Sequence, residues 1–131
     1  MAYIGSTINN SPTIAGTLAD AIKGEAAFLA VKFDDAGNIA LAGKGEAAVG
    51  VIVPGNVEDP AAGDEVTIQI KDIGVAKAGG KISAGAAVAV SADGKLGAAA
   101  TGDFIVGFAL SGADGDGKTF QIQITKSGYA K

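Results

Sequence analysis

The chain has 131 residues and a net charge of −4, and it contains no cysteine, histidine or arginine. This length predicts a single domain, and the missing side chains exclude disulfides, thiolate metal sites and histidine-based nucleophile–base pairs. The ten basic residues are all lysines and form no basic block, which disfavours nucleic acid as a partner because phosphate recognition relies on clustered positive charge.

No stretch of the sequence approaches the ~20 apolar residues that a membrane-spanning helix requires, and the N-terminus lacks the features of a signal peptide. We therefore expect no membrane partner and synthesis in the cytoplasm. Glycine is abundant, with 21 residues, and the many alanines stand in short stretches cut by glycine, aspartate and lysine. Short segments with frequent turn signals are typical of an all-β fold.

Residues 1–27 are expected to form an extended N-terminal arm ahead of a β-barrel domain that spans residues 28–131. The stretch STINNSPT is polar and rich in turn formers, and TLADAIK would add either one helical turn or more of the arm. Such a terminus is either disordered or ordered only on assembly, against a neighbouring subunit or another partner. In the second case the residues expected to make the contact are Tyr3, Ile4, Ile8, Asn9 and Asn10.

The rest of the chain contains an internal repeat, which spans residues 30–70 and 87–124. Residues 30–53 align without a gap with residues 87–110, at an offset of 57, and small and apolar residues recur in register. The match continues at an offset of 54, where VTIQI of the first copy corresponds to FQIQI of the second. The chain is therefore predicted to contain two similar structural units.

Each copy begins with a short strand, residues 29–33 in the first copy, which leads into a glycine-containing hairpin turn. A second short strand follows, and then a more apolar strand, residues 47–53 in the first copy. Gly50 interrupts this strand, as Gly107 does in the second copy, and glycine there indicates a bulge, a bend or a close approach of another backbone. The last strand of each copy alternates apolar and polar residues, as in a half-buried antiparallel strand.

Between the copies, residues 71–85 predict a further hairpin that turns at Gly79 and Gly80. The complete pattern indicates about eight to ten short strands. We therefore expect an all-β protein, a small antiparallel β-barrel or sandwich built from two similar units.

The loop SGADGDG contains Asp114 and Asp116, which raises the question of a metal site. An EF-hand calcium loop needs carboxylate or amide ligands in its first half and a glutamate at its end. Counting from Asp114 puts Lys118 at a ligand position, and counting from Gly112 puts a glutamine at the end of the loop. The equivalent loop of the first copy, residues 54–65, is also acidic. The two aspartates are therefore expected to be solvated turn residues, and no metal or other cofactor is expected.

The remaining candidate groups do not form a catalytic site either. Asp34 and Asp35 are adjacent, so on a strand they would point to opposite faces, and their counterparts Ser91 and Ala92 carry no carboxylate. Lys95 follows a hairpin tip but lacks the flanking methionines of a carrier domain. The stretch GKGEAAVG lacks the serine or threonine of a phosphate-binding loop. These departures predict that the protein is not an enzyme.

The order of motifs resembles the capsid decoration (cement) proteins of tailed bacteriophages over about residues 24–125. The resemblance rests on GEAAVGVIV, AAGDEVTIQI, AGGKISAGAAVAVSADGKL, GDFIVGFAL and the closing FQIQI. It implies a β-barrel protein of the virion that binds the outer surface of the phage head as a homotrimer and stabilises the shell. Its expected partners are the major capsid protein and further copies of itself, and the resemblance supplies no catalytic residues.

The alternative function is a β module of a virion fibre that binds a glycan or a host surface. Sugar-binding sites usually present aromatic rings, and the chain has five phenylalanines, two tyrosines and no tryptophan. Tyr129, near the C-terminus, is the one obvious candidate for such a ring.

Overall fold

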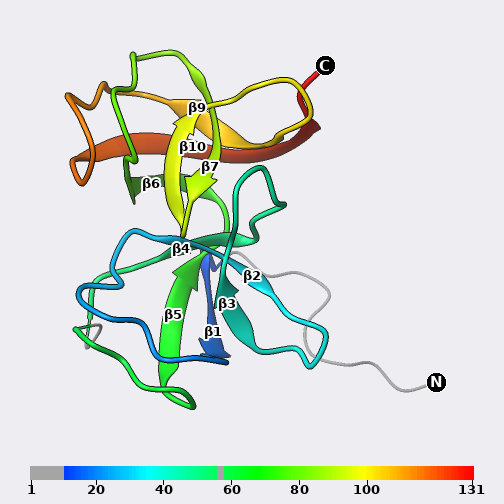
Figure 1. The fold of residues 1–131 in the computed structure, drawn as a ribbon, viewed down its shortest axis with the longest axis vertical. Coiled ribbons are helices and arrows are strands. Elements are labelled where there is room, and N and C mark those ends of the chain that lie inside the picture. Colours follow the sequence, from blue (N-terminus) through cyan, green and yellow to red (C-terminus); the bar gives the residue numbers. More distant parts are fainter. Residues whose placement is uncertain (1–10, 56–57) are drawn as a thin grey trace.

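The computed structural model describes residues 11–55 and 58–131. Among these residues the regular structure consists of short β-strands, and no helix is long and apolar enough to cross a membrane. The strands, shown in Figure 1, are β1 (Thr13–Thr17), β2 (Ala30–Phe33), β3 (Ile39–Leu41), β4 (Gly50–Ile52), β5 (Glu65–Gln69), β6 (Asp72–Lys77), β7 (Ala87–Ala92), β8 (Lys95–Ala98), β9 (Phe104–Ala109) and β10 (Thr119–Tyr129).

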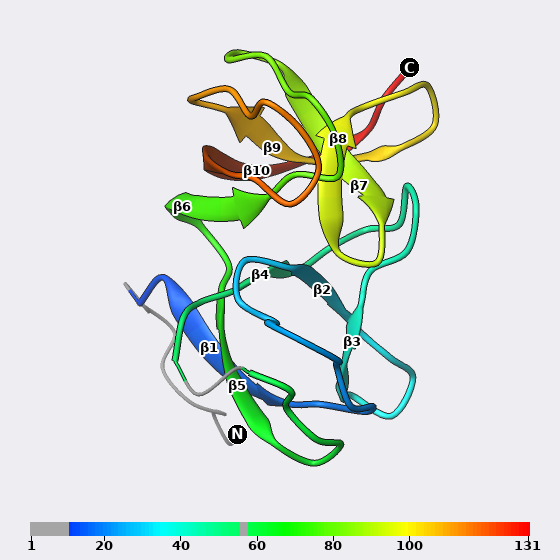
Figure 2. The same ribbon diagram turned by 60° about the vertical axis from the view of Figure 1, so that its left-hand side comes forward.

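The strands form two antiparallel sheets with the same topology. The first sheet has the order β1-β5-β4-β2-β3, and the second has the order β6-β10-β9-β7-β8. Each strand of the second sheet therefore takes the place of the strand five positions earlier in the chain. The all-β class and the construction from two similar units are confirmed, as two five-stranded sheets that pack against each other (Figure 2).

The closing strands show why the sequence folds in this way. In β10, Phe120, Ile122 and Ile124 are buried, whereas Gln121 and Gln123 are exposed. Apolar side chains at every second position of a strand point to one face, and that face becomes the core. The alternation predicted for both closing strands is confirmed.

The same predicted hairpin turn is built in two ways. In the second unit, Asp93 and Gly94 have positive φ values of 46° and 81°, as a two-residue hairpin loop of type I′ requires. In the turn of the first unit only Gly37 has a positive φ, of 84°. This turn is longer, and the Asp34 carboxylate supports it. Its Oδ1 accepts hydrogen bonds from the backbone N–H groups of Ala36 and Asn38, at 3.0 and 2.8 Å.

The interruptions at Gly50 and Gly107 are confirmed as close backbone approaches. A Cβ atom on Gly50 would overlap the carbonyl oxygen of Gln69 on the neighbouring strand. A Cβ atom on Gly107 would overlap the carbonyl oxygen of Gln123 in the same manner. Only glycine lets these two strands pair at this distance.

The described part of the expected arm belongs to the first sheet, which corrects the boundary drawn at residue 27. Residues 13–17 form β1 and pair along their length with β5. Downstream, Leu18, Ile22 and Ala26 are buried in the first core, because this segment covers one side of the sheet.

The hairpin expected over residues 71–85 is also corrected. β6 pairs with β10 rather than with the residues that follow Gly79 and Gly80. Ile82, beyond that turn, instead forms an isolated bridge with Ala113. The reason is that β6 begins the second unit, where it is the counterpart of β1.

The two cores are not equivalent. The first core consists only of residues from the first unit. The second core combines residues of the second unit with four residues of the first, namely Ala30, Ala42, Ala48 and Val51. The outer face of the first sheet therefore completes the core of the second unit.

Main-chain hydrogen bonds hold this contact between the units. The β7–β8 hairpin points toward the first sheet in Figure 2. At its tip, the carbonyl of Gly94 accepts a hydrogen bond from the Ala30 N–H at 2.7 Å, and the Gly94 N–H donates to the carbonyl of Ala42. Gly45 N–H donates to the Val90 carbonyl at 2.9 Å. The Gln69 side-chain amide donates to the carbonyls of residues 71 and 73, which fixes the connection between β5 and β6.

Candidate functional site

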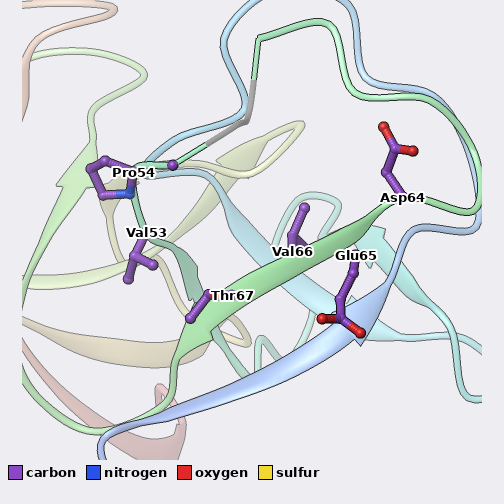
Figure 3. A pocket seen from close by; sticks show the side chains of 7 residues that line it. Val53, Pro54, Asp64, Glu65, Val66 and Thr67 are labelled. Carbon is purple, nitrogen blue, oxygen red and sulfur yellow. The ribbon is translucent and has the colours of Figure 1, made fainter.

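A polar surface hollow of about 240 Å³ lies between the end of β4 and the start of β5 (Figure 3). Its two carboxylates belong to Asp64 and Glu65, and Figure 3 shows them pointing to different sides of the chain. Asp64 accepts a hydrogen bond from the backbone N–H of Ala61 at 2.9 Å and so closes a turn. The hollow therefore presents no facing pair of groups for acid–base chemistry. Its walls are Val53, Pro54, Gly55, Asp64, Glu65, Val66 and Thr67.

The two aspartates of the acidic loop have different surroundings. Asp116 forms an ion pair with Lys95 of the β7–β8 hairpin, with 2.9 Å between Oδ1 and Nζ. Asp114 is exposed. Within residues 11–55 and 58–131 no three acidic side chains gather into a group that could hold a metal ion. Asp116 thus ties the loop to the adjacent hairpin.

Glu46, in the stretch GKGEAAVG, makes a compact local network. Its carboxylate accepts hydrogen bonds from Lys32 Nζ at 2.9 and 2.7 Å and from the Gly43 backbone N–H at 2.6 Å. The hydrogen bond from Lys32, and then that from Gly43, lower the pKa of Glu46 below its ordinary value of 4.5. The counterpart of Glu46, Asp103, accepts a bond from the N–H of Ala100 in the same way, at 3.0 Å. Both carboxylates therefore serve to close turns.

Replacing Glu46 with glutamine should lower the free energy of unfolding by less than about 1 kcal/mol at neutral pH, because the ion pair is exposed to solvent. Since folding lowers the pKa of Glu46, the stabilisation is complete above the unfolded-state pKa and disappears as the pH falls below 4.5. Urea unfolding of both proteins at a series of pH values measures the difference. A difference that grows on acidification would contradict this assignment.

The most distinctive surface is an apolar row across the outer face of the second sheet. Directly paired residues of β6, β10, β9 and β7 form this row, in the order Ile73, Gln123, Phe108 and Ala87. We call it the second outer row. Ile73 is 57% exposed and Phe108 is 39% exposed. Two large apolar side chains therefore stand in solvent on the same sheet face.

The surroundings of the second outer row extend its apolar character. Leu110, beside it on the chain, is 43% exposed, and its N–H donates to the carbonyl of Gln121. Val75, which pairs with Gln121 from the other side, is half-buried. The polar residues within and beside the row, Gln123 and Gln121, are uncharged, and Lys77 and Thr119 lie farther along the same face. Large apolar side chains exposed together on one face of a protein mark a surface for protein contact.

Two further exposed aromatic residues lie elsewhere. Phe33, at the end of β2, is 49% exposed. Tyr129 is 63% exposed, and its ring packs edge-on against Phe104, with 5.4 Å between the ring centroids. Tyr129 is thus accessible, as expected from the sequence.

The contact residues predicted from the sequence, namely Tyr3, Ile4, Ile8, Asn9 and Asn10, lie outside the described residues. The second outer row was missed. A signal for it was present, since Phe108 and Leu110 stand at alternate positions of a strand whose other face is also apolar. A strand that is apolar on both faces is usually covered on both. The sequence does not show that the face carrying Phe108 is exposed.

No protein-family model matches the chain, and no curated protein has significant sequence similarity to it. Among solved structures, the chain is similar to the crystal structure of the head fibre gp8.5 N base in bacteriophage phi29. The TM-score is 0.65, with 18% sequence identity, and the alignment covers 91% of this chain and 98% of that chain. This similarity shows a shared fold over nearly the whole length of both chains.

Proposed function

We propose that this protein is a structural component of a tailed-phage virion that binds the outer surface of the head as a homotrimer and stabilises the shell. The observation that carries the proposal is the fold similarity to the head fibre base of phi29, which extends over 91% of the chain. The resemblance of the sequence to capsid decoration proteins points to the same class of protein. The major capsid protein is the proposed partner.

The surface chemistry supports a role in protein contacts. The second outer row and Leu110 offer apolar area, whereas the carboxylates of the candidate sites close turns or pair with lysine. A decoration protein needs no catalytic group, because binding selectively to the intact shell shifts the equilibrium toward that state. Many copies, each burying a modest interface, add up to a large stabilisation.

The test uses heads of the phage that encodes this protein, assembled without it. Purified protein should co-sediment with these heads up to a fixed number of copies per head, and decorated heads should release their DNA at a higher temperature than bare heads. The matched control is the same amount of heat-denatured protein. Heads that bind none of the native protein would contradict the proposal.

A fibre-associated role is the second candidate function, because the similar structure is itself the base of a head fibre. In this role Tyr129, with its exposed ring, would be the residue available to stack on a sugar. Binding to a glycan array that is lost in Tyr129→Ser would favour this function over decoration.

A further inference from the structure

The outer faces of the two sheets are equivalent in position but not in environment. The second outer row has a counterpart on the first sheet, where directly paired residues follow in the order Thr13, Gln69, Val51 and Ala30. We call this the first outer row. Both rows place a glutamine on the closing strand and an alanine on the strand after the long loop. The two glutamines, Gln69 and Gln123, are separated by the repeat offset of 54, and the two alanines by the offset of 57.

In the first outer row Val51 and Ala30 are buried and the other two residues are half-buried, whereas Ile73, Gln123 and Phe108 of the second outer row are exposed. Val51 is 1% exposed and Ala30 is fully buried, because both belong to the core of the second unit. Of their counterparts, Phe108 is exposed and Ala87 is half-buried, and residues 11–55 and 58–131 place no third unit over them. Phe108 is larger than Val51, and Ile73 is larger and more apolar than Thr13. The uncovered row thus offers more apolar area than the covered one.

The tip of the β7–β8 hairpin lies against the Ala30 end of the first outer row. Gly94 of this tip exchanges hydrogen bonds with Ala30 and Ala42, and Val90 contributes its carbonyl to Gly45 and its side chain to the shared core. The contact therefore joins the outer face of one unit to the hairpin tip of the next.

The first unit carries the counterpart of that hairpin tip, and in the described part of the chain its residues 35–37 are exposed. Gly37 corresponds to Gly94, and Phe33 corresponds to Val90, at the offset of 57. Phe33 is 49% exposed where Val90 is 1% exposed. The β2–β3 hairpin projects away from the second sheet in both Figure 1 and Figure 2. One end of the molecule thus presents an open outer row, and the other presents an open tip.

We propose that the β2–β3 hairpin tip of one copy docks on the second outer row of another copy, repeating between chains the contact that joins the two units within the chain. This inference deepens the homotrimer of the proposed function and rests on it for the number of copies. The contact is head-to-tail, because two different surfaces meet. A head-to-tail contact closes into a ring when the rotation from one copy to the next is a whole fraction of 360°. Three chains would then place six similar sheets around one axis.

The repeated contact is not identical in every part. Within the chain, Gly45 binds Val90 of the second unit, but its counterpart Gly102 donates instead to the carbonyl of Ala130 in the C-terminal segment. β10 extends along β9 as far as Tyr129 and occupies that side. The proposed contact is therefore centred on Ile73, Phe108 and Ala87, away from the C-terminal segment.

Cysteine cross-linking tests the geometry, because the chain has no native cysteine. Ala36→Cys places a thiol in the hairpin tip, and Ala87→Cys places one in the second outer row. A short bismaleimide should give a covalent dimer when the two variants are mixed, and little or none with either variant alone. Ala87→Cys cross-linking to itself as well as in the mixture would overturn the proposal, since it indicates two outer rows face to face. A chain carrying both changes should give a covalent trimer.

Light scattering tests the contact residues in the isolated protein, without heads. The wild-type mass should be three times the 12.7 kDa of the chain. Phe108→Glu and Phe33→Ser should each weaken self-association at least tenfold while leaving the circular dichroism spectrum unchanged, and Tyr129→Ser is the matched control with an exposed ring outside both surfaces. A wild-type protein that is monomeric at about 100 μM would overturn the inference.

Monomers that still bind heads would leave the decoration role intact, whereas trimers that bind no heads would count against that role alone.

Discussion

Val51→Asp is expected to lower the free energy of unfolding by about 3–5 kcal/mol, because it places an unpaired charge in a water-free contact. Val51 is 1% exposed and lies in the core that the two units share. No lysine pairs with this position in the described residues, so the carboxylate would have to be neutralised or the units would have to separate. The midpoint of urea denaturation, followed by circular dichroism, measures the loss.

The internal repeat supplies a matched control for this change. Phe108→Asp alters the equivalent position of the second sheet, where the side chain is 39% exposed. Its carboxylate can reach water, so the unfolding free energy of the dilute protein should change by no more than about 1 kcal/mol. If both variants lost the same unfolding free energy, Val51 on the outer face of the first sheet would not behave as a core residue.

Gly50→Ala and Gly107→Ala should each lower the free energy of unfolding by about 3 kcal/mol, the upper range for overpacking. In both variants the new methyl group would overlap a backbone carbonyl, of Gln69 or of Gln123. A backbone oxygen in a paired strand cannot rotate away as a side chain can. The strands must separate locally, and hydrogen bonds of the ladder are lost.

Gly80→Ala is the control for these two variants. A Cβ atom at Gly80 meets nothing within 4 Å, and its φ is not positive. Alanine should therefore be neutral or slightly stabilising there, since it reduces the freedom of the unfolded chain. Thermal unfolding of the three variants side by side makes the comparison, and a similar loss for all three would argue against the steric explanation.

Much of the fold could be predicted because the repeat carries strong local signals. Glycine turns, the alternation in VTIQI and FQIQI, and the paired glycines at positions 50 and 107 each have a direct physical meaning. β1 was missed because its side chains are mostly small or polar. The β6 segment was expected to be half of a local hairpin, so its pairing with β10 was not predicted. β1 is held by pairing with β5, which depends on residues about 50 positions away and leaves no local pattern.

The candidate surface was harder to predict than the fold. Sequence patterns indicated that Phe108 lies on an apolar strand, but only the packing of the two units shows which sheet face is covered. Val51 and Phe108 have the same local sequence context and differ because one faces the next unit and the other faces solvent. The acidic loop was interpreted more easily, because its spacing does not meet the ligand rules of a calcium loop.

The connection between the two sheets has a consequence for how the equivalent contacts respond to protein concentration. β5 ends at Gln69 and β6 begins at Asp72, so two residues join the units. A tether this short gives the partners a high effective concentration, and the contact at Val51 therefore persists at any dilution. The proposed contact at Phe108 has no tether. The two interfaces are structurally equivalent, but the one at Val51 belongs to the folded monomer. The one at Phe108 would form only at a high local concentration of copies, such as on a surface that binds many of them.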